Sequence, residues 1–244
     1  MIDFFGVETY NTLTDKIIPF YKKNDIIGKY HVPFGNMNNG YPITIGGVEF
    51  ANVEVAYICA FFSKEDEKSV FIQNLIKNET NGMMCKRKYR KSSEFKIFGR
   101  EDFDDSLWHF HFMLFLVWSK CLQNKEFAVL LKKIPQNYII VENEPMKGDY
   151  AIWGCCNKEY NKICKDNSKK IKEINPQLKT SAIKELENEF RTNNYNIGIW
   201  KGRNCMGKIL MSCRDALQNN TIPPIDYNLL TKSNIYWFGK QLFF

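Results

Sequence analysis

The sequence predicts an α+β fold in which helices predominate and the β-sheet is small. Segments with a helical start signal and a helical spacing of apolar residues outnumber the segments typical of strands. No internal repeat is present, and 44% hydrophobic with 25% charged residues is the balance of an ordinary globular chain. A chain of 244 residues can bury a sizeable core. We therefore expect one compact domain over residues 1–244.

The first half of the chain predicts a hairpin and then a series of helices. Alternating residues on either side of Gly46-Gly47 predict two strands joined by a glycine turn. Asn52 can accept hydrogen bonds from the first amides of a helix over 53–62, which places Glu54 in its first turn. Ser63 followed by Asp66 predicts the start of a second helix that runs to about Lys77, and further helices are expected over 106–121 and 125–133.

The second half begins with a strand and ends in an aromatic tail. Residues 138–142 are rich in β-branched side chains and lead into the polar loop 143–148. The lysine- and asparagine-rich stretch 157–196 is expected to be a surface insertion, with a helical stripe of apolar residues in its second half. A strong helix is expected over 204–217. The tail at 218–244 is expected to pack on the body, because exposed aromatic patches are a liability.

Composition limits where the protein is expected to work. The formal charge is 34 − 27 = +7. The longest apolar run, 112–118, has seven residues, whereas a membrane-spanning helix needs about twenty. Asp3, Glu8 and Asp15 interrupt the first thirty residues, which a secretory signal would not allow. We therefore expect a cytoplasmic protein that has no membrane partner.

Eight cysteines and three histidines could serve metal or thiol chemistry. No two cysteines have the two-residue spacing of a zinc or redox motif, so free thiols and no bound metal are expected. His109 and His111 lie two residues apart on an expected helix and therefore point to different faces. A core or boundary position is expected for His109, with contact to a ligand as the alternative.

Two acidic residues stand in settings suited to catalysis. Glu54 follows a turn-rich loop at a helix start, where its charge either serves catalysis or only meets the helix dipole. Asp149 precedes Trp153-Gly154, which would place a hydrogen-bonding acid beside an aromatic stacking surface. The alternative for Trp153 is a plain core position, because tryptophan side chains are mostly buried.

The stretch 202–207 begins a helix with a glycine at either end. Such a turn can present backbone amides to a phosphate, or its glycines can serve the turn and close helix packing. The sequence contains no G-x-G-x-x-G after a strand and no G-x-x-x-x-G-K-[ST]. It also lacks a serine elbow and an H-E-x-x-H motif, which leaves carboxylate chemistry as the enzymatic option.

Five positive charges in six residues form a basic run at 86–91. The charged members are Lys86, Arg87, Lys88, Arg90 and Lys91. If all five contacted phosphates, the log–log salt slope of binding would be about 3.5 to 4.5. Nucleic-acid contact is one interpretation of the run, and a solvated loop is the other.

Several separate blocks of the chain occur in the order found in the NADAR (NAD- and ADP-ribose-associated) family, which the sequence resembles over about residues 18–217. The most specific block, G-x-N-x-[LM]-G-x-[IL]-L-M-x-x-R, runs from Gly202 to Arg214. The other blocks are 34–37, 42–43, Gly47, Glu54, Met113, Lys120, 123–124, 130–131, 141–142, Asp149 and 153–154.

The resemblance implies a compact, mostly helical YbiA-like α+β domain that hydrolyses N-glycosidic bonds, and we expect no cofactor. Family members are associated with two substrate classes: ADP-ribose attached to guanine in nucleic acid, and phosphorylated ribosylamine-type intermediates of riboflavin synthesis. Gly-Asn-Met followed by Gly-Tyr-Pro-Ile is more similar to the members that remove ADP-ribose from guanine. The expected partner is therefore ADP-ribosylated nucleic acid or an ADP-ribose-containing small molecule, with a functional link to an ADP-ribosyltransferase toxin.

The resemblance also implies roles for individual residues. Glu54 would activate water or stabilise the cationic sugar, and Asp149 would hold ribose hydroxyls or act as a second acid. The substrate-binding positions are Asn36, Lys120, Trp153, Gly154, Gly202, Asn204, Gly207 and Arg214. Gly202, Asn204 and Gly207 would present amides to the diphosphate, and Lys120 and Arg214 would supply charge. For Arg214 the alternative is to buttress the fold through buried hydrogen bonds.

Two other classes of protein remain open from the sequence. A non-catalytic ADP-ribose or nucleotide reader would bind its ligand and tolerate loss of the acidity of Glu54. A nucleic-acid-binding accessory protein acting through the basic run would show steep salt dependence without a preference for modified bases.

Overall fold

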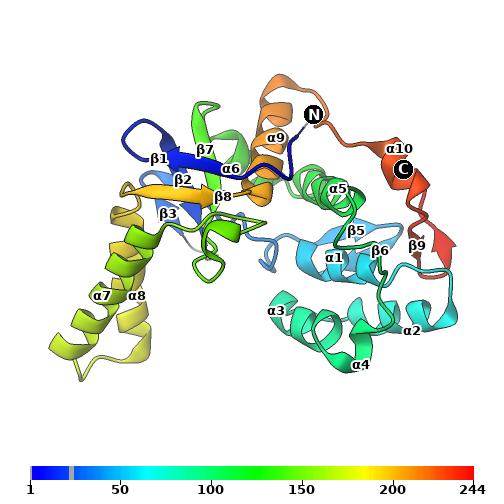
Figure 1. Ribbon diagram of the computed structural model, residues 1–244, viewed down its shortest axis with the longest axis horizontal. Coiled ribbons are helices and arrows are strands. Elements are labelled where there is room, and N and C mark those ends of the chain that lie inside the picture. Colours follow the sequence, from blue (N-terminus) through cyan, green and yellow to red (C-terminus); the bar gives the residue numbers. More distant parts are fainter. Residues whose placement is uncertain (1, 22–24) are drawn as a thin grey trace. The chain divides into compact units, whose positions relative to one another are not determined.

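The computed structural model describes residues 2–21 and 25–244, and it shows an α+β fold rich in helices (Figure 1). The chain divides into two compact units, each made of two separate segments. The first unit comprises Met1–Gly35 and Leu130–Arg214, and the second comprises Asn36–Val129 and Asp215–Phe244. Two helices, α6 (Lys125–Lys132) and α9 (Cys205–Asn219), begin in one unit and end in the other.

The described residues of the first unit form three pairs of strands and a helical hairpin. Its antiparallel pairs are β1 (Glu8–Asn11) with β8 (Ile199–Gly202), and β3 (Ile26–Ile27) with β4 (Tyr30–His31). Its parallel pair is β2 (Lys16–Phe20) with β7 (Tyr138–Glu142). The 3-10 turn η2 (Gly148–Tyr150) precedes the hairpin of α7 (Lys158–Ile174) and α8 (Thr180–Asn193), drawn in yellow-green and yellow in Figure 1.

A small aromatic and aliphatic core holds these strands and the base of α7 together. Trp200 of β8 is fully buried, and its ring centroid lies 5.3 Å from that of Tyr160 on α7. Ile17 of β2 and Val141 of β7 belong to the same cluster. The strand partners lie far apart in the sequence, so this core closes long loops of chain.

The second unit is built mainly of helices. In chain order these are α1 (Val53–Phe61), α2 (Glu67–Ile76), α3 (Gly82–Cys85), the π-helix η1 (Lys86–Arg90), α4 (Ser93–Lys96), α5 (Trp108–Gln123) and α10 (Tyr227–Lys232). Two short antiparallel pairs accompany them: β5 (Ile43–Ile45) with β6 (Val48–Phe50), and β9 (Tyr236–Trp237) with β10 (Lys240–Gln241).

Local signals that the sequence carries account for several of these elements. Gly46 and Gly47 have φ of 56° and 78°, the left-handed conformation that a two-residue hairpin turn requires at both positions. Asn52 caps α1, its side chain accepting from Val55 N at 3.1 Å. Asp66 caps α2 in the same way, through Ser69 N. The predicted hairpin and the helices of this part of the chain are therefore confirmed, within a few residues at their ends.

The structure also corrects the expected elements. The strand at 138–142 is confirmed, but its parallel partner β2 was not foreseen, and the described residues form five separate two-stranded sheets in place of one small sheet. The insertion is helical in both halves, because α7 occupies 158–174. The tail packs as expected within the second unit, where Trp237 is buried and donates to Ile45 O at 3.0 Å.

Over the described residues, no helix is long and apolar enough to cross a membrane. The eight cysteines are free thiols, and seven of them are buried. No group of three or more His, Cys, Asp or Glu side chains in this part of the chain is arranged to hold a metal ion.

Candidate functional site

Glu54 lies in the first turn of α1 and is almost completely buried, with 5% of the residue exposed. The cap at Asn52 fixes where the helix begins, and the amide of Glu54 donates to Asn36 O at 3.1 Å. The Gly-Asn-Met segment of the sequence therefore contacts the start of α1 directly. The carboxylate of Glu54 lies in the first turn of α1, near the positive end of the helix dipole.

The wall around Glu54 comes from segments that the sequence did not connect. A β-carbon built on Gly82 would lie 3.0 Å from Glu54 Cβ and 3.1 Å from Met37 Cγ, so only glycine fits there comfortably. The amide of Asn52 donates to Asn39 Oδ1 at 2.7 Å and to Thr80 O at 3.1 Å. Gly82 was missed by the sequence analysis, because nothing in its own neighbourhood reveals this close approach.

A lysine of the basic run lies beside the buried carboxylate. Lys86 Nζ is 3.1 Å from Glu54 Oε1, and the two side chains are 26% and 7% exposed. Glu54 Oε1 is buried and accepts no hydrogen bond from the described residues, so the pair is ionic without hydrogen-bond geometry. This oxygen is therefore charge-compensated and still able to accept a proton or a hydrogen bond.

Asn36 connects this site to the long helix α5. Its side-chain amide donates to the sulfur of Met113 at 3.2 Å, while its backbone carbonyl accepts from Glu54. Glu54, Asn36 and Lys86, all singled out from the sequence, are thus brought together in the second unit. The proximity of Lys86 to Glu54 was not foreseen.

The basic run is a turn of π-helix, not a loop, and its charges have different environments. Lys86 pairs with Glu54, and Lys88 lies 3.0 Å from Glu79 Oε1. Hydrogen bonds from Lys88 to Tyr89 and Glu79 raise the pKa of that ammonium. Arg87 and Lys91 are exposed. An unbroken patch of five cations, which the sequence suggested as a nucleic-acid contact, is therefore not formed.

Arg90 is packed among aromatic rings. Its guanidinium carbon lies 5.5 Å from the ring centroid of Tyr57, 5.6 Å from Phe61 and 5.1 Å from Phe103. It also forms an ion pair with Asp104, and its side chain is only 15% exposed. The cation is already stacked and paired within the second unit, and contact between Arg90 and nucleic acid stays a prediction.

Tyr57 lies on α1, and its hydroxyl is 2.8 Å from Nδ1 of His109 on α5. Burial lowers the pKa of His109 to about 4, so the imidazole is neutral at pH 7. Burial likewise raises the pKa of Tyr57. His109 is therefore a buried residue within the core of the second unit, which agrees with the first of the two expectations for it.

Lys120 is buried, with 1% of the residue exposed. Its Nζ lies 3.9 Å from the ring centroid of Phe127 and 5.3 Å from that of Tyr41, and no carboxylate among the described residues pairs with it. Desolvation lowers the pKa of Lys120 to about 7. The ammonium does not reach the surface, so the expected contact between Lys120 and a substrate phosphate is not open to it in this arrangement.

Asp149 lies in the first unit at η2, half-exposed, between two lysines. Its carboxylate oxygens are 3.1 Å from Lys158 Nζ and 3.4 Å from Lys201 Nζ. The hydrogen bond from Lys158 is the main cause that holds the pKa of Asp149 below its ordinary value. Asp149 is therefore ionised at neutral pH, which suits an acceptor for hydroxyl groups better than a general acid.

The start of α9 does not offer free amides where the sequence suggested a diphosphate site. The amide of Asn204 donates to Gly154 O at 3.1 Å, and that of Met206 donates to Trp153 O at 2.7 Å. Residues 203 and 205 donate to the carbonyls of residues 151 and 152. The anion-binding role of the Asn204 amide is therefore corrected, because the backbone of 151–154 already occupies this helix terminus.

The glycines of the same motif lie where backbones touch. A β-carbon on Gly154 would lie 2.0 Å from Glu142 O, one on Gly202 would lie 2.4 Å from Gly154 O, and one on Gly207 would lie 2.1 Å from Ile140 O. Asn204, with φ of 51°, donates its side-chain amide to Ile140 O at 2.9 Å. These contacts favour the packing interpretation of the motif.

Arg214 has a structural position at the end of the motif. It is 2% exposed, and its guanidinium donates to Tyr138 O at 2.7 Å, Pro135 O at 3.0 Å and Gln136 O at 3.2 Å. These donors hold the loop that precedes β7, and substrate binding by Arg214 stays a prediction. Its buttressing alternative agrees with this geometry.

Trp153 is half-buried, next to the buried Gly154. Its partial exposure is compatible with stacking on a base of a ligand.

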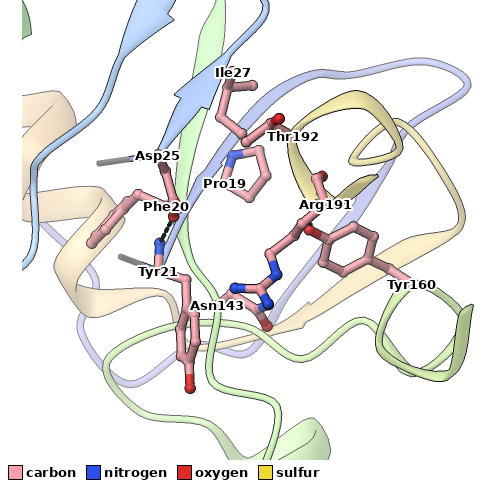
Figure 2. Close-up of a pocket in the computed structure, with 9 residues that line it drawn as sticks. All are labelled: Pro19, Phe20, Tyr21, Asp25, Ile27, Asn143, Tyr160, Arg191 and Thr192. Atoms are coloured by element: carbon pink, nitrogen blue, oxygen red, sulfur yellow. Dashed lines mark hydrogen bonds between the residues drawn. The ribbon is translucent and has the colours of Figure 1, made fainter. Parts of the chain in front are cut away.

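Figure 2 shows a small cavity at the carboxyl ends of β2 and β7 in the first unit. Asp25 accepts from Tyr21 N at 2.8 Å at its edge, and Arg191 lies 5.5 Å from the Tyr21 ring centroid. Arg191 Nη1 and Asn143 Oδ1 are buried without hydrogen-bond partners among the described residues. One donor and one acceptor in a polar cavity suit a bridging water. None of its lining residues was a candidate from the sequence.

Comparisons with known proteins add a partial structural likeness. No protein-family model matches the chain, and no curated protein is significantly similar to it. Among solved structures, the NMR structure of the E. coli protein YbiA is similar, with 22% sequence identity and a TM-score of 0.44. The match covers 57% of this chain and 72% of that one. Neither the fold described above nor the roles of the residues rest on this likeness.

Proposed function

We propose that the chain is an N-glycosidase that hydrolyses a ribosyl C–N bond, with ADP-ribose on guanine in nucleic acid as the substrate. The observation that carries this proposal is the environment of Glu54. Its carboxylate is buried at a helix start, compensated by Lys86, and keeps one oxygen without a hydrogen bond. The resemblance of the sequence blocks to the NADAR family supports the choice of reaction and substrate.

The reaction needs what Glu54 can supply. Cleavage of a ribosyl C–N bond builds positive charge on the sugar ring, as in other glycoside hydrolyses. In the proposed step, water oxygen bonds to the anomeric carbon and the electron pair of the C–N bond leaves on the guanine nitrogen. Glu54 takes a proton from the attacking water, and transfer of that proton to the guanine nitrogen restores the carboxylate and balances the step. General base catalysis of this kind contributes about 10² to 10⁴ in rate.

Lys86 serves as a positioning residue in this proposal. Its ammonium lies beside Glu54 Oε1 and fixes the carboxylate without occupying the oxygen through a hydrogen bond. Asp149 is ionised and half-exposed, so its proposed role is to accept hydrogen bonds from ribose hydroxyls. Trp153 is proposed to stack on a base.

The test is a product assay by mass spectrometry on the wild type, Glu54→Gln and the control Glu49→Gln. Glu49 is an exposed carboxylate on β6, so its variant makes the same chemical change away from the site. Each protein is offered an oligonucleotide with ADP-ribosylated guanine and, separately, the ribosylamine intermediates of riboflavin synthesis. We expect release of ADP-ribose and plain guanine by the wild type and Glu49→Gln, and none by Glu54→Gln.

Other outcomes would redirect the proposal. Turnover of the riboflavin intermediates alone would make the chain a metabolite N-glycosidase. Binding of ADP-ribose by all three proteins without any product would make it a reader. Full turnover by Glu54→Gln would remove Glu54 from the mechanism.

A further inference from the structure

The exposed side of α7 carries a row of lysines. Lys158, Lys162, Lys165, Lys169 and Lys172 are all exposed, and together we call them the lysine face. At 3.6 residues per turn, these positions fall within an arc of about 80° along the whole helix. The row is about 21 Å long at 1.5 Å per residue. Five cations thus follow one line on one rigid element.

The opposite side of α7 is turned toward the first unit and α8. Tyr160 is buried against Trp200 and donates its hydroxyl to Arg191 O at 3.1 Å. Ser168 is bonded to Glu187 of α8, and Ile171 is half-buried. Tyr160 is buried and the other apolar residues of α7 are half-buried, except Ile174 at its last position, which is exposed.

Acidic groups lie at the ends and on one flank of the lysine face. Lys172 is 3.6 Å from Glu187, and Lys158 is 3.1 Å from Asp149, which also contacts Lys201 of β8. The flanking carboxylates of α7 itself are Glu159, Asp166 and Glu173. No ion pair among the described residues involves Lys162, Lys165 or Lys169, so the middle of the row is open to an external anion.

We propose that the lysine face binds the phosphate backbone of a nucleic acid. This inference rests on the proposed function for one point only, namely that the nucleic acid is the polymer that carries the modified guanine. The row begins beside Asp149, the residue proposed to hold ribose hydroxyls, and runs away from it along α7. A length of about 21 Å corresponds to about six base-pair steps along the axis of a duplex, at about 3.4 Å each.

A nucleic acid fits this surface better than an anionic membrane does. A helix that lies in a membrane interface inserts an apolar face between the lipids. The apolar residues of α7 are buried or half-buried except Ile174 at its last position, so the helix has no continuous apolar face to insert. A backbone of evenly spaced phosphates binds to a line of exposed cations, and α7 provides such a line.

The lysine face, and not the run at 86–91, is the surface that we propose for nucleic-acid binding. In the run at 86–91, Lys86, Lys88 and Arg90 already have acidic partners within the second unit. In the lysine face, the three central lysines do not. The number of positive charges in a short stretch was therefore a poorer guide to polyanion binding than their positions on a helix.

The test measures binding of unmodified oligonucleotides, so it does not depend on turnover. Fluorescence anisotropy with labelled single-stranded and duplex DNA gives Kd at several salt concentrations for the wild type and for Lys162→Gln/Lys165→Gln/Lys169→Gln. We expect the log–log salt slope to fall by about 2 for single strands and by about 2.7 for duplex, as three phosphate contacts are lost. The control Lys133→Gln/Lys184→Gln/Lys232→Gln removes the same charge from other exposed positions and should leave the slope unchanged.

A triple Lys→Arg variant at positions 162, 165 and 169 keeps the charge and should keep the slope. Equal slopes for the wild type and the triple Gln variant would overturn the proposal. Equal losses in the Gln variant and its control would do so too, since only net charge would then matter. Binding to vesicles of phosphatidylserine and phosphatidylcholine, with none to DNA, would assign the surface to membranes instead. If DNA binding follows the lysine face while no glycosidase activity is found, the inference stands and the proposed function fails.

Discussion

Lys86 Nζ lies 3.1 Å from Glu54 Oε1, and this ion pair joins the start of a regular helix to a turn of π-helix. The carboxylate is nearly buried, while the lysine keeps about a quarter of its surface in water. A buried charge that loses its partner is costly, because the low-dielectric surroundings do not solvate it. The pair therefore both stabilises this part of the fold and holds the candidate catalytic oxygen.

Lys86→Gln should lower both stability and turnover. Removing the ammonium leaves Glu54 buried and uncompensated, at a cost of about 1 to 3 kcal/mol given the partial exposure of Lys86. The double variant with Glu54→Gln should be more stable than the sum of the single effects implies, by at least about 0.5 kcal/mol. Urea unfolding of the four proteins measures this coupling. Strict additivity would contradict an interaction between the two side chains.

Lys120→Met should stabilise the protein and flatten its pH dependence. The pKa of Lys120 is about 7 in the fold, against an ordinary value of 10.5. Between pH 7 and pH 10.5, Lys120 is protonated in the unfolded chain but neutral in the fold. The free energy of unfolding is therefore highest above pH 10.5 and falls as the pH falls toward 7. The loss is about 5 kcal/mol, because the two pKa values differ by 10.5 − 7 = 3.5 and each unit corresponds to about 1.4 kcal/mol.

Thermal or urea unfolding of the wild type and Lys120→Met from pH 7 to pH 10 tests this sign. The difference in the free energy of unfolding should be largest at pH 7 and should shrink as pH rises. Lys133→Met, at an exposed position, serves as the control and should change neither stability nor slope. A wild type that is more stable than Lys120→Met at pH 7 would show that the buried ammonium has a favourable partner.

Arg214→Lys should destabilise the chain although the charge is kept. The guanidinium donates to three carbonyls of residues 135–138, and one ammonium cannot reach all of them. Leaving buried carbonyls without donors costs about 1 to 3 kcal/mol. Urea unfolding measures the loss, and affinity for ADP-ribose by calorimetry should stay constant under conditions where the variant is folded. A selective loss of affinity with unchanged stability would return Arg214 to the ligand.

The sequence predicted best what local signals control. The cap at Asn52 and the turn at Gly46-Gly47 act over a few residues, and the hairpin and helices that they specify are present. The parallel pairing of β2 with β7 was not predicted, because the two strands are distant in sequence and each is too short to reveal its partner. Helix α7 was partly missed since its many lysines obscured the apolar positions that pack inward.

In the candidate site too, contacts between nearby segments were predicted and contacts between distant segments were not. Glu54 and Asn36 were named from the sequence and do meet, because a short loop and a capped helix bring them together. The partners of the basic run could not be read from its composition, since Glu54, Glu79 and Asp104 come from three other segments. The amides at the start of α9 were assigned to a ligand because the carbonyls of 151–154 that accept from them are remote in sequence.

The close backbone contacts at Gly154, Gly202 and Gly207 have an evolutionary consequence. Any side chain at these positions would force β7, β8 and α9 apart, so selection for a folded chain alone is enough to preserve the glycines. A descendant that lost its activity would keep this signature as faithfully as an active one. Under the proposed function, copies that retain the chemistry are better recognised by the residues that surround Glu54: the Gly-Asn-Met loop, the glycine at 82 and the lysine at 86.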